Sequence, residues 1–394
     1  MNLLFYCQHS LGLGHLARSL RLAAALAERF EVTLLNGGRL PAGTVVPPGV
    51  TLVNLPPLGH DDRYQLVSHD PLLSVEQACQ ARRERVLATL ASTAPAAVVI
   101  ELYPFGRKKF EFELIPLLDA AHARADRPVI VCSLRDLLVR SNDQARSDER
   151  RSRLVNTFFD AVLVHADPRF ARLEESFRPQ TPLRVPVLYT GFVAPEALGD
   201  TGDATTERLP RVLVSSGGGM VGEPLVRAAV AAHAEVARRS GLATTVVAGP
   251  FLPEPVWTWL QEQAARFPAL SAIRSVPDLR AAIARSAVSV SQAGYNTTMD
   301  LLRTRTPAVL VPYGDGDEDE QLRRAQRLAA LGVAELLPPG ELDGSRLADV
   351  VVAAAGRPPQ PTAFDLSGAS TTASLVAGLV RALLAKPAVA GNLR

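Results

Sequence analysis

The sequence is poor in cysteine, in net charge and in long apolar runs, and each shortage excludes a class of protein. The three cysteines (Cys7, Cys79 and Cys132) lack the spacing of a metal site, and two of them lie in apolar runs, so we interpret them as small buried side chains. A formal net charge of +2 is too small to indicate a nucleic acid as partner. No apolar run reaches the ~20 residues that a membrane-spanning helix needs, and the apolar start is too short for a secretory signal. We therefore expect a cytoplasmic protein, with a membrane-facing surface patch left open.

What the chain does contain is a globular composition and a pattern that occurs twice. With 394 residues, of which 47% are hydrophobic and 21% charged, the chain is long enough for two domains. Short apolar runs alternate with helical patterns over residues 3–165 and again over residues 211–336, which is typical of parallel sheets covered by helices on both faces. Residues 195–206, between them, are rich in Pro, Gly, Asp and Thr and show no apolar periodicity.

The predicted fold is therefore α/β, with two doubly wound Rossmann-like domains. We expect an N-terminal domain over residues 1–194, a linker over 195–210, a second domain over 211–366, and a C-terminal helix and tail over 367–394 that pack back toward the first domain. Doubly wound sheets bind ligands at the carboxyl ends of their strands, and two such domains are expected to leave a cleft between them. The loops that follow strands should therefore carry the function.

The first such loop is residues 9–15 (HSLGLGH), which stands between a predicted strand and a predicted helix. Its glycines, Gly12 and Gly14, permit a tight turn and the close approach of a ligand to a helix N-terminus. His15 lies in the first helical turn and has a side chain suited to proton transfer near neutral pH. A histidine that is hydrogen-bonded within the loop is the alternative interpretation.

Loops of the second predicted domain carry groups that suit a nucleotide sugar. Residues 215–219 (SSGGG) offer a concave row of backbone N–H donors for a phosphate, unless the glycines serve only the turn. Their spacing is neither that of a Walker loop nor that of a dinucleotide fingerprint. Residues 291–298 (SQAGYNTT) place hydroxyl and amide groups at a helix start. Asp300, one turn later, can hold two sugar hydroxyls or stabilise the helix dipole.

An acidic loop, residues 315–321 (DGDEDEQ), completes the set of candidate loops. It lacks the final bidentate Glu of a calcium loop, so calcium is not expected. Most of its acids would be solvated or would stabilise the following helix dipole. Glu320 and Gln321 lie closest to that helix and can hydrogen-bond a polyol.

Taken in order, these motifs resemble the MurG-like branch of the GT-B glycosyltransferases, which build peptidoglycan and glycolipid precursors from UDP-sugars. The resemblance rests on a set of motifs in the second predicted domain. These are the SGGG loop of residues 216–219, the GYNTT helix start of residues 294–298, Asp300, Pro307 and Pro312 on either side of a strand, and Glu320-Gln321 followed after two residues by Arg324-Ala325. Residues 12–18 (GLGHLAR) resemble the N-terminal loop of that branch, and also that of UDP-sugar hydrolases of nonulosonic-acid pathways, which share the fold. Three further segments resemble an uncharacterised group of predicted glycosyltransferases: residues 101–107, 133–136 and 189–192.

The resemblance implies a role for each motif. The two glycine-containing turns would hold the donor diphosphate, and backbone contacts at Val276 would hold the base. Asp300 would bind the ribose, and Glu320 and Gln321 would bind the hydroxyls of the donor sugar. Asp300 stands where the family more often has the longer Glu. The expected donor-binding residues are Gly14, Ser216, Gly217, Gly218, Gly219, Val276, Gln292, Gly294, Tyr295, Asn296, Thr297, Thr298, Asp300, Glu320 and Gln321. No metal and no other cofactor is expected, because helix N-termini take the place of the cation.

The same resemblance makes His15 the expected general base, with Asp136 and Glu101 at predicted strand ends as alternative bases unless they pair with neighbouring arginines. The expected activity is that of a hexosyl- or N-acetylhexosaminyltransferase. It would move a sugar from a nucleotide-diphosphate sugar, with UDP as the expected nucleotide, to an acceptor hydroxyl or amine, with inversion and without a metal. The alternatives are a UDP-sugar hydrolase with the same donor site, a sugar-nucleotide 2-epimerase and a non-catalytic sugar-nucleotide binder. The acceptor stays unidentified, no nucleic acid is expected, and a monomer or homodimer with peripheral membrane contact stays open.

Overall fold

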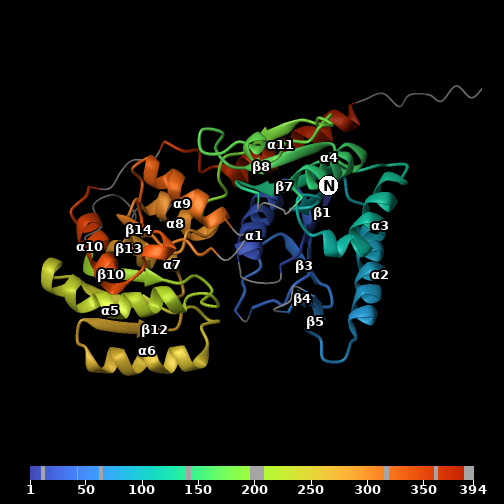
Figure 1. Cartoon of the computed structure of the whole chain (residues 1–394). Helices are drawn as coiled ribbons and strands as arrows, with labels where there is room; N and C mark the ends of the chain where they lie inside the picture. Colours follow the sequence, from blue (N-terminus) through green and yellow to red (C-terminus); the bar gives the residue numbers. More distant parts are fainter. Residues whose placement is uncertain are drawn as a thin grey trace, which may run out of the picture. The chain divides into compact units, whose positions relative to one another are not determined.

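The computed structural model describes residues 1–9, 14–41, 43–61, 65–138, 143–195, 208–314, 319–358 and 363–385, which form two compact units. Unit 1 contains Met1–Leu138, Asp143–Val193 and the C-terminal segment that begins at Asp365, and unit 2 contains Ala194–Phe364. Most of the predicted linker, residues 195–210, lies outside the described residues. Figure 1 shows both units, with labels on many of their helices and strands.

Unit 1 is built on a parallel sheet of seven strands in the order β3-β2-β1-β6-β7-β8-β9. These strands are β1 (Asn2–Cys7), β2 (Glu31–Asn36), β3 (Val50–Asn54), β6 (Ala97–Glu101), β7 (Val129–Arg135), β8 (Ala161–His165) and β9 (Val187–Tyr189). β4 (Leu58–His60) and β5 (Leu66–Ser68) pair antiparallel outside it. The described helices are α1 (Gly14–Ala27), α2 (Val75–Thr93), α3 (Glu111–His122), α4 (Gln144–Phe158) and α11 (Gly368–Leu384), with short 3₁₀ turns η1 (Lys108–Phe110) and η2 (Leu173–Glu175).

Local sequence signals account for these elements. Every residue of β6 and of β8 is buried, as expected of central parallel strands that are covered on both faces. α2 begins at a capping box, in which the Ser74 hydroxyl accepts the Gln77 N–H and the Gln77 side chain accepts the Ser74 N–H. α3 continues through Pro116, which interrupts one backbone hydrogen bond without ending the helix.

The C-terminal helix α11 belongs to unit 1. Its buried face contains Val376, Ala377 and Val380, which join the same core cluster as Leu22 and Leu26 of α1. Figure 1 shows this helix, coloured red, among elements from the first half of the chain. Segments about 350 residues apart in the sequence therefore share one hydrophobic core.

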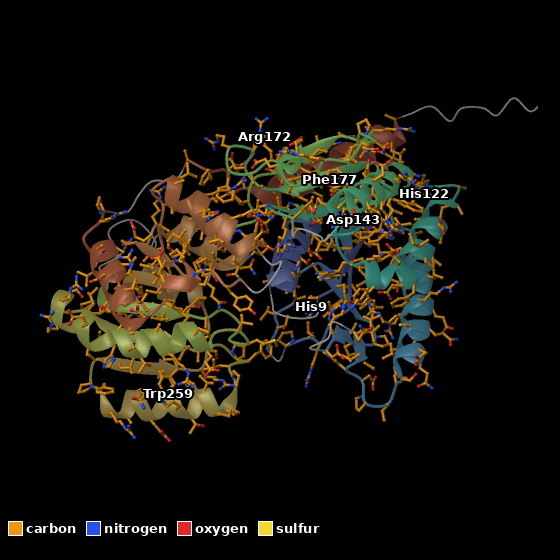
Figure 2. All side chains as sticks on the ribbon, in the orientation of Figure 1. His9, His122, Asp143, Arg172, Phe177 and Trp259 are labelled. Atoms are coloured by element: carbon orange, nitrogen blue, oxygen red, sulfur yellow. The ribbon has the colours of Figure 1, made fainter. Side chains whose placement is uncertain are left out.

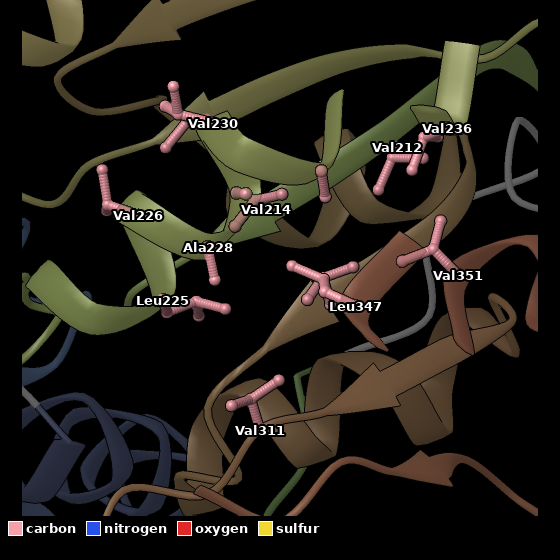
Figure 3. Packing of buried hydrophobic residues seen from close by; sticks show 14 of the residues in the cluster. Val212, Val214, Leu225, Val226, Ala228, Val230, Val236, Val311, Leu347 and Val351 are labelled. Atoms are coloured by element: carbon pink, nitrogen blue, oxygen red, sulfur yellow. The ribbon is translucent and has the colours of Figure 1, made fainter. Parts of the chain in front are cut away.

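Unit 2 has a parallel sheet of six strands in the order β12-β11-β10-β13-β14-β15. They are β10 (Leu209–Ser215), β11 (Ala243–Val247), β12 (Leu270–Ile273), β13 (Ser286–Ser291), β14 (Ala308–Leu310) and β15 (Glu335–Leu336). The described helices are α5 (Glu223–Ser240), α6 (Glu254–Arg266), α7 (Leu279–Ala284), α8 (Tyr295–Thr304), α9 (Glu320–Ala330) and α10 (Gly344–Ala355), with the 3₁₀ turn η4 (Pro339–Glu341). Figure 3 shows Val212 and Val214 of β10 packed with side chains of α5 and α10 in the core of this unit.

The strand order confirms the α/β prediction and locates one candidate binding edge in each unit. β1 lies between β2 and β6, and β10 lies between β11 and β13, so the order of strands reverses beside the first strand of each sheet. Doubly wound sheets bind ligands at the carboxyl ends of the strands at such a switch point. The edges to inspect are therefore the residues after β1 and β6 and those after β10 and β13.

The structure also shows where the three cysteines lie and whether any described helix could span a membrane. Cys7 and Cys132 are free thiols buried in β1 and β7, and Cys79 is a half-buried free thiol in α2. Among the described residues, no helix combines the length and the apolar character needed to cross a bilayer.

Candidate active site

The switch point of unit 1 brings His15 together with Glu101, although 86 residues separate them in the sequence. His15 lies in the first turn of α1, and Glu101 is the last residue of β6, the strand that pairs with β1. Nδ1 of His15 lies 2.6 Å from Oε1 of Glu101. The Glu101 side chain is fully buried, whereas 18% of the His15 side chain is exposed. An inner carboxylate thus supports an imidazole that solvent can reach.

Two arginines complete this charged cluster. Nη2 of Arg18 donates to Glu101 Oε1 at 2.5 Å, and Nη2 of Arg107 donates to Glu101 Oε2 at 3.3 Å. Burial alone would raise the pKa of Glu101, but His15, Arg107 and Arg18 together hold that pKa below its usual range. Burial lowers the pKa of His15 to about 4, assisted by Arg107 and Arg18 and opposed by Glu101. His15 is therefore neutral at neutral pH, and a ring that donates its Nδ1–H to a carboxylate carries its basic lone pair on Nε2.

The loop that follows Glu101 holds a strained backbone. Leu102 has a φ of 65° and Arg107 has a φ of 62°, a left-handed conformation that bulky side chains rarely adopt. In this conformation Arg107 reaches back to the Glu101 carboxylate. Such outliers persist only where the surrounding structure imposes them, and they concentrate at functional sites. The strained loop lies within the 101–107 segment that the sequence analysis singled out.

The other candidates of unit 1 lie at or near the same edge. Asp136 follows β7 and is 3% exposed, and Gly14 begins α1, while residues 10–13 lie outside the described part of the chain. His9, labelled in Figure 2, is buried with Nε2 3.0 Å from Asn36 Oδ1. Glu101 was expected as an alternative base, but His15, Arg107 and Arg18 hold its pKa below the usual range against the effect of burial, which makes this carboxylate a poor proton acceptor. We infer that Glu101 orients His15 instead.

In unit 2, the turn after β10 depends on Ser216 and on two of its glycines. The Ser216 hydroxyl donates to the carbonyl of Ala248 at 2.5 Å, so it supports the turn and leaves only the backbone of Ser216 for the predicted donor contact. Gly217 and Gly219 have φ values of 63° and 92°. A Cβ at Gly219 would lie 2.5 Å from the Ala248 carbonyl oxygen, whereas one at Gly218 would meet nothing closer than 3.5 Å. The turn therefore needs glycine and presents bare backbone to a ligand.

The turn after β13 lies beside this glycine turn. Ser291 of β13 pairs with Ser215 of β10, and the Gln292 side-chain amide donates to the Val221 carbonyl at 3.2 Å. Gly294 is the N-cap of α8 and has no side chain that could occupy the N–H groups of the first helical turn. Two backbone-lined turns therefore converge at the switch point of unit 2, where helix N-termini favour an anion.

The side chains at the start of α8 divide into two groups. Asn296 and Thr297 are half-exposed, whereas Tyr295, Thr298 and Asp300 are at most 6% exposed. The first two are therefore accessible for the predicted donor contacts. Asp300, predicted to hold the ribose, presents only a small part of its surface.

Arg324, which was not among the predicted site residues, connects α9 to the turn before α8. It is fully buried, its Nη2 donates to Glu320 Oε1 at 2.5 Å, and its Nη1 donates to the Ala293 carbonyl at 2.7 Å. The four-residue spacing between Glu320 and Arg324 on one helix was the signal available in the sequence. The Gln321 side-chain carbonyl accepts the Tyr313 N–H at 3.2 Å. Val276, the predicted base contact, lies half-buried between β12 and α7.

Comparison with known proteins finds a similarity in the second part of the chain. Residues 218–373 match the glycosyltransferase family 28 C-terminal domain. One relative, the UDP-N-acetylglucosamine--N-acetylmuramyl-(pentapeptide) pyrophosphoryl-undecaprenol N-acetylglucosamine transferase of Rhizobium johnstonii, is 29% identical over 117 residues. That alignment covers 29% of this chain and 31% of the relative, so the chain matches about a third of the length of that protein.

Solved structures extend the similarity to the whole fold. The calicheamicin glycosyltransferase CalG4 is similar with a TM-score of 0.58 at 17% identity, over 97% of this chain and 94% of CalG4. MurG of Acinetobacter baumannii is similar with a TM-score of 0.54 at 15% identity, over 97% of this chain and 99% of MurG. The predicted resemblance to MurG-like GT-B glycosyltransferases is confirmed. The chain thus has the GT-B fold with two Rossmann-like units, and its residues 218–373 are similar to the glycosyltransferase family 28 C-terminal domain.

Proposed function

We propose that this protein transfers a sugar from a nucleoside-diphosphate sugar to an acceptor hydroxyl or amine. The observation that carries the proposal is the pair of His15 and Glu101, a neutral imidazole with a buried carboxylate behind it, in a chain whose residues 218–373 match a glycosyltransferase domain. A bare donor-binding domain would need no such pair. The pair therefore favours an enzyme over a non-catalytic binder.

Unit 2 supplies the donor site in this proposal. The backbone of residues 217–219 and the start of α8 at Gly294 offer N–H groups and a positive helix end for the diphosphate. Arg324 holds the Glu320 carboxylate and the peptide before Gly294, so that the sugar contacts and the diphosphate contacts share one support. We infer that these backbone dipoles neutralise the leaving diphosphate without a metal ion.

In this proposal, unit 1 contributes the general base, His15. Nε2 of His15 takes the proton from the hydroxyl or amine that receives the sugar, while the oxygen or nitrogen of that group forms its bond to the anomeric carbon. The bond from that carbon to the diphosphate oxygen breaks on the opposite face, and the nucleoside diphosphate leaves with the bonding electrons. Glu101 stabilises the imidazolium that results. The anomeric configuration is inverted, because attack and departure occur on opposite faces.

We take UDP-N-acetylglucosamine as the first donor to test. The Rhizobium johnstonii relative is named for this donor, and its alignment with this chain spans 117 residues. That relative is also named for a pyrophosphoryl-undecaprenol acceptor, which is a lipid. We accordingly propose a cytoplasmic monomer or homodimer that contacts membranes peripherally, and sedimentation with vesicles would test that contact.

The test of the proposed function is the release of nucleoside diphosphate from a panel of nucleotide sugars, each with and without candidate acceptors. Transfer predicts release of UDP that requires an acceptor and a product heavier by one sugar. Release of UDP or sugar phosphate in water alone would instead establish a hydrolase that uses the same His15 to activate water. Binding without any release over the whole panel would contradict an enzymatic role.

A further inference from the structure

Exposed apolar side chains gather at one edge of unit 2. In the described part of this unit seven large hydrophobic residues are exposed, and four of them, Met220, Val221, Phe251 and Ile273, follow or end β10, β11 or β12 at the carboxyl edge of the sheet. None of the four belongs to the hydrophobic core cluster of the unit, so packing of the core does not explain why apolar residues stand at this edge. Apolar groups that gather on a surface are typical of a place where something binds.

Phe251 is the aromatic member of this group, and its loop is firmly held. Its N–H donates to the Gly218 carbonyl at 2.8 Å, and Nη2 of Arg274 donates to the carbonyls of Pro250 and Leu252 at 3.0 and 2.9 Å. The ring lies beside the glycine turn, since a Cβ on Gly218 would lie 3.5 Å from Phe251 Cδ2. The residue is nevertheless 43% exposed. A fixed loop therefore presents an aromatic side chain to solvent.

The strand order places this ring on the path of a bound nucleotide. β11 lies between β10, which leads to the glycine turn, and β12, which leads to Val276. Neighbouring strands lie about 4.8 Å apart, so the ends of β10 and β12 are separated by about 10 Å. A nucleotide with its diphosphate on the glycine turn, as proposed above, and its base at Val276, as the resemblance implies, would cross the end of β11. Phe251 stands there.

We propose that Phe251 stacks on the nucleoside of the donor and is a binding residue of the donor site. This inference rests on the proposed function and adds to it the contact that holds the base. An aromatic ring stacks on any base, because every base has a π-face. Phe251 thus provides affinity, while backbone groups near Val276 are left to distinguish one base from another.

The experiment is calorimetric titration of the full-length protein and its variants with UDP, dTDP and inorganic pyrophosphate. Phe251→Ala should weaken UDP and dTDP by the same factor, about tenfold, because stacking on one base is worth roughly 5- to 150-fold in affinity. Pyrophosphate, which has no base, should bind equally to both proteins. Phe251→Trp should restore the affinity for UDP.

The matched control is Phe267→Ala. Phe267 is also exposed, but it follows α6 and packs on His233 with ring centroids 4.6 Å apart, away from the loops after β10, β11 and β12. It should leave all three affinities unchanged. If Phe251→Ala bound UDP with the affinity of the wild type, the inference would be overturned and the proposed donor site would stand. If the variant lost as much affinity for pyrophosphate as for UDP, the inference would also be overturned, because that result would indicate a collapsed glycine turn. Failure of the wild-type protein to bind any nucleotide would overturn the donor site itself.

Discussion

At the scale of single residues, the proposed chemistry depends on the protonation state of His15. Burial, reinforced by Arg107 and Arg18, lowers the pKa of His15 to about 4, so that the imidazole is unprotonated over the whole neutral range. A histidine with an ordinary pKa of about 6.5 would be partly protonated there. The cluster around Glu101 thus keeps the imidazole unprotonated at neutral pH, as the proposed general base requires.

The pH dependence of kcat/KM follows from this shift. A base must be unprotonated, so activity is lost as the pH falls through its pKa, and a lowered pKa moves that loss toward acid. We expect kcat/KM to stay level from about pH 8 down to about pH 5.5 and to fall below about pH 5. Initial rates of UDP release across this range provide the measurement. A fall with its midpoint near pH 6.5 would show an unshifted histidine and contradict the assignment.

Glu101→Gln separates orientation from charge. Glutamine can still accept the Nδ1–H of His15, but it cannot stabilise the imidazolium, and it leaves Arg18 and Arg107 without their carboxylate. We expect kcat to fall by about 100-fold or more, since general-base catalysis contributes roughly 10²- to 10⁴-fold. The Kd for UDP should be unchanged, because the proposed donor contacts lie in unit 2. A variant with unchanged kcat would show that the carboxylate does not assist the base.

At the scale of elements, Arg324 joins α9 to the turn before α8 in the proposed donor site. Arg324 is the connection, since it donates both to Glu320 and to the carbonyl of Ala293. Arg324→Met removes both contacts and leaves the Glu320 carboxylate without this partner in a site that is 9% exposed. We expect the KM for the donor to rise by at least about tenfold, the effect of losing about 1.4 kcal/mol of binding. Gln326→Ala, an exposed position on the same helix, is the control and should leave KM unchanged.

The glycine turn offers a second prediction, with a control inside the same motif. Gly219→Ala forces a side chain into a φ of 92° and against the Ala248 carbonyl, so the turn must change. We expect a lower melting temperature and loss of UDP binding. Gly218→Ala, which meets only Phe251 at 3.5 Å, should keep the wild-type melting temperature. Equal melting temperatures for Gly219→Ala and the wild type would contradict the account of the turn.

The strands and turns could be predicted from the sequence, whereas contacts between distant elements could not. Apolar periodicity and glycine positions depend on local sequence, so the strands and the turns that follow them were predictable. The pair of His15 and Glu101 depends on β6 lying next to β1, which no local pattern determines. The inward hydroxyl of Ser216 and the contact of Arg324 with the Ala293 carbonyl likewise depend on packing between elements distant in the sequence. The contact of Arg324 with Glu320 lies within one helix and follows from the four-residue spacing.

At the scale of the whole molecule, the last described helix, α11, packs in the unit that contains β1. α11 contributes Val376 and Val380 to the core that contains β1 and α1. Val376→Asp should therefore raise the hydrogen-exchange rates of peptides from α1 and β1, because a buried charge without a partner is costly. Ser374→Asp, on the exposed face of the same helix, should have little effect. Faster exchange confined to unit 2 would contradict the place of α11.

The fold class was predictable at this scale because two runs of alternating strands and helices are visible in the sequence. The predicted domain borders, at residues 194 and 366, stand close to the changes of unit at Val193–Ala194 and Phe364–Asp365. The order of strands was not predictable, because both sheets could be wound in several ways from the same alternation. That order is what brings the candidate residues to one edge in each unit.

The central claim is that unit 2 binds the donor while His15 of unit 1 acts as the base. The most direct measurement is the rate of nucleoside diphosphate release by His15→Ala, beside its Kd for UDP. We expect turnover to fall by about 10²- to 10⁴-fold while the Kd for UDP stays unchanged. Full turnover in His15→Ala would contradict the central claim and would leave Asp136, at the same sheet edge, as the base to examine next.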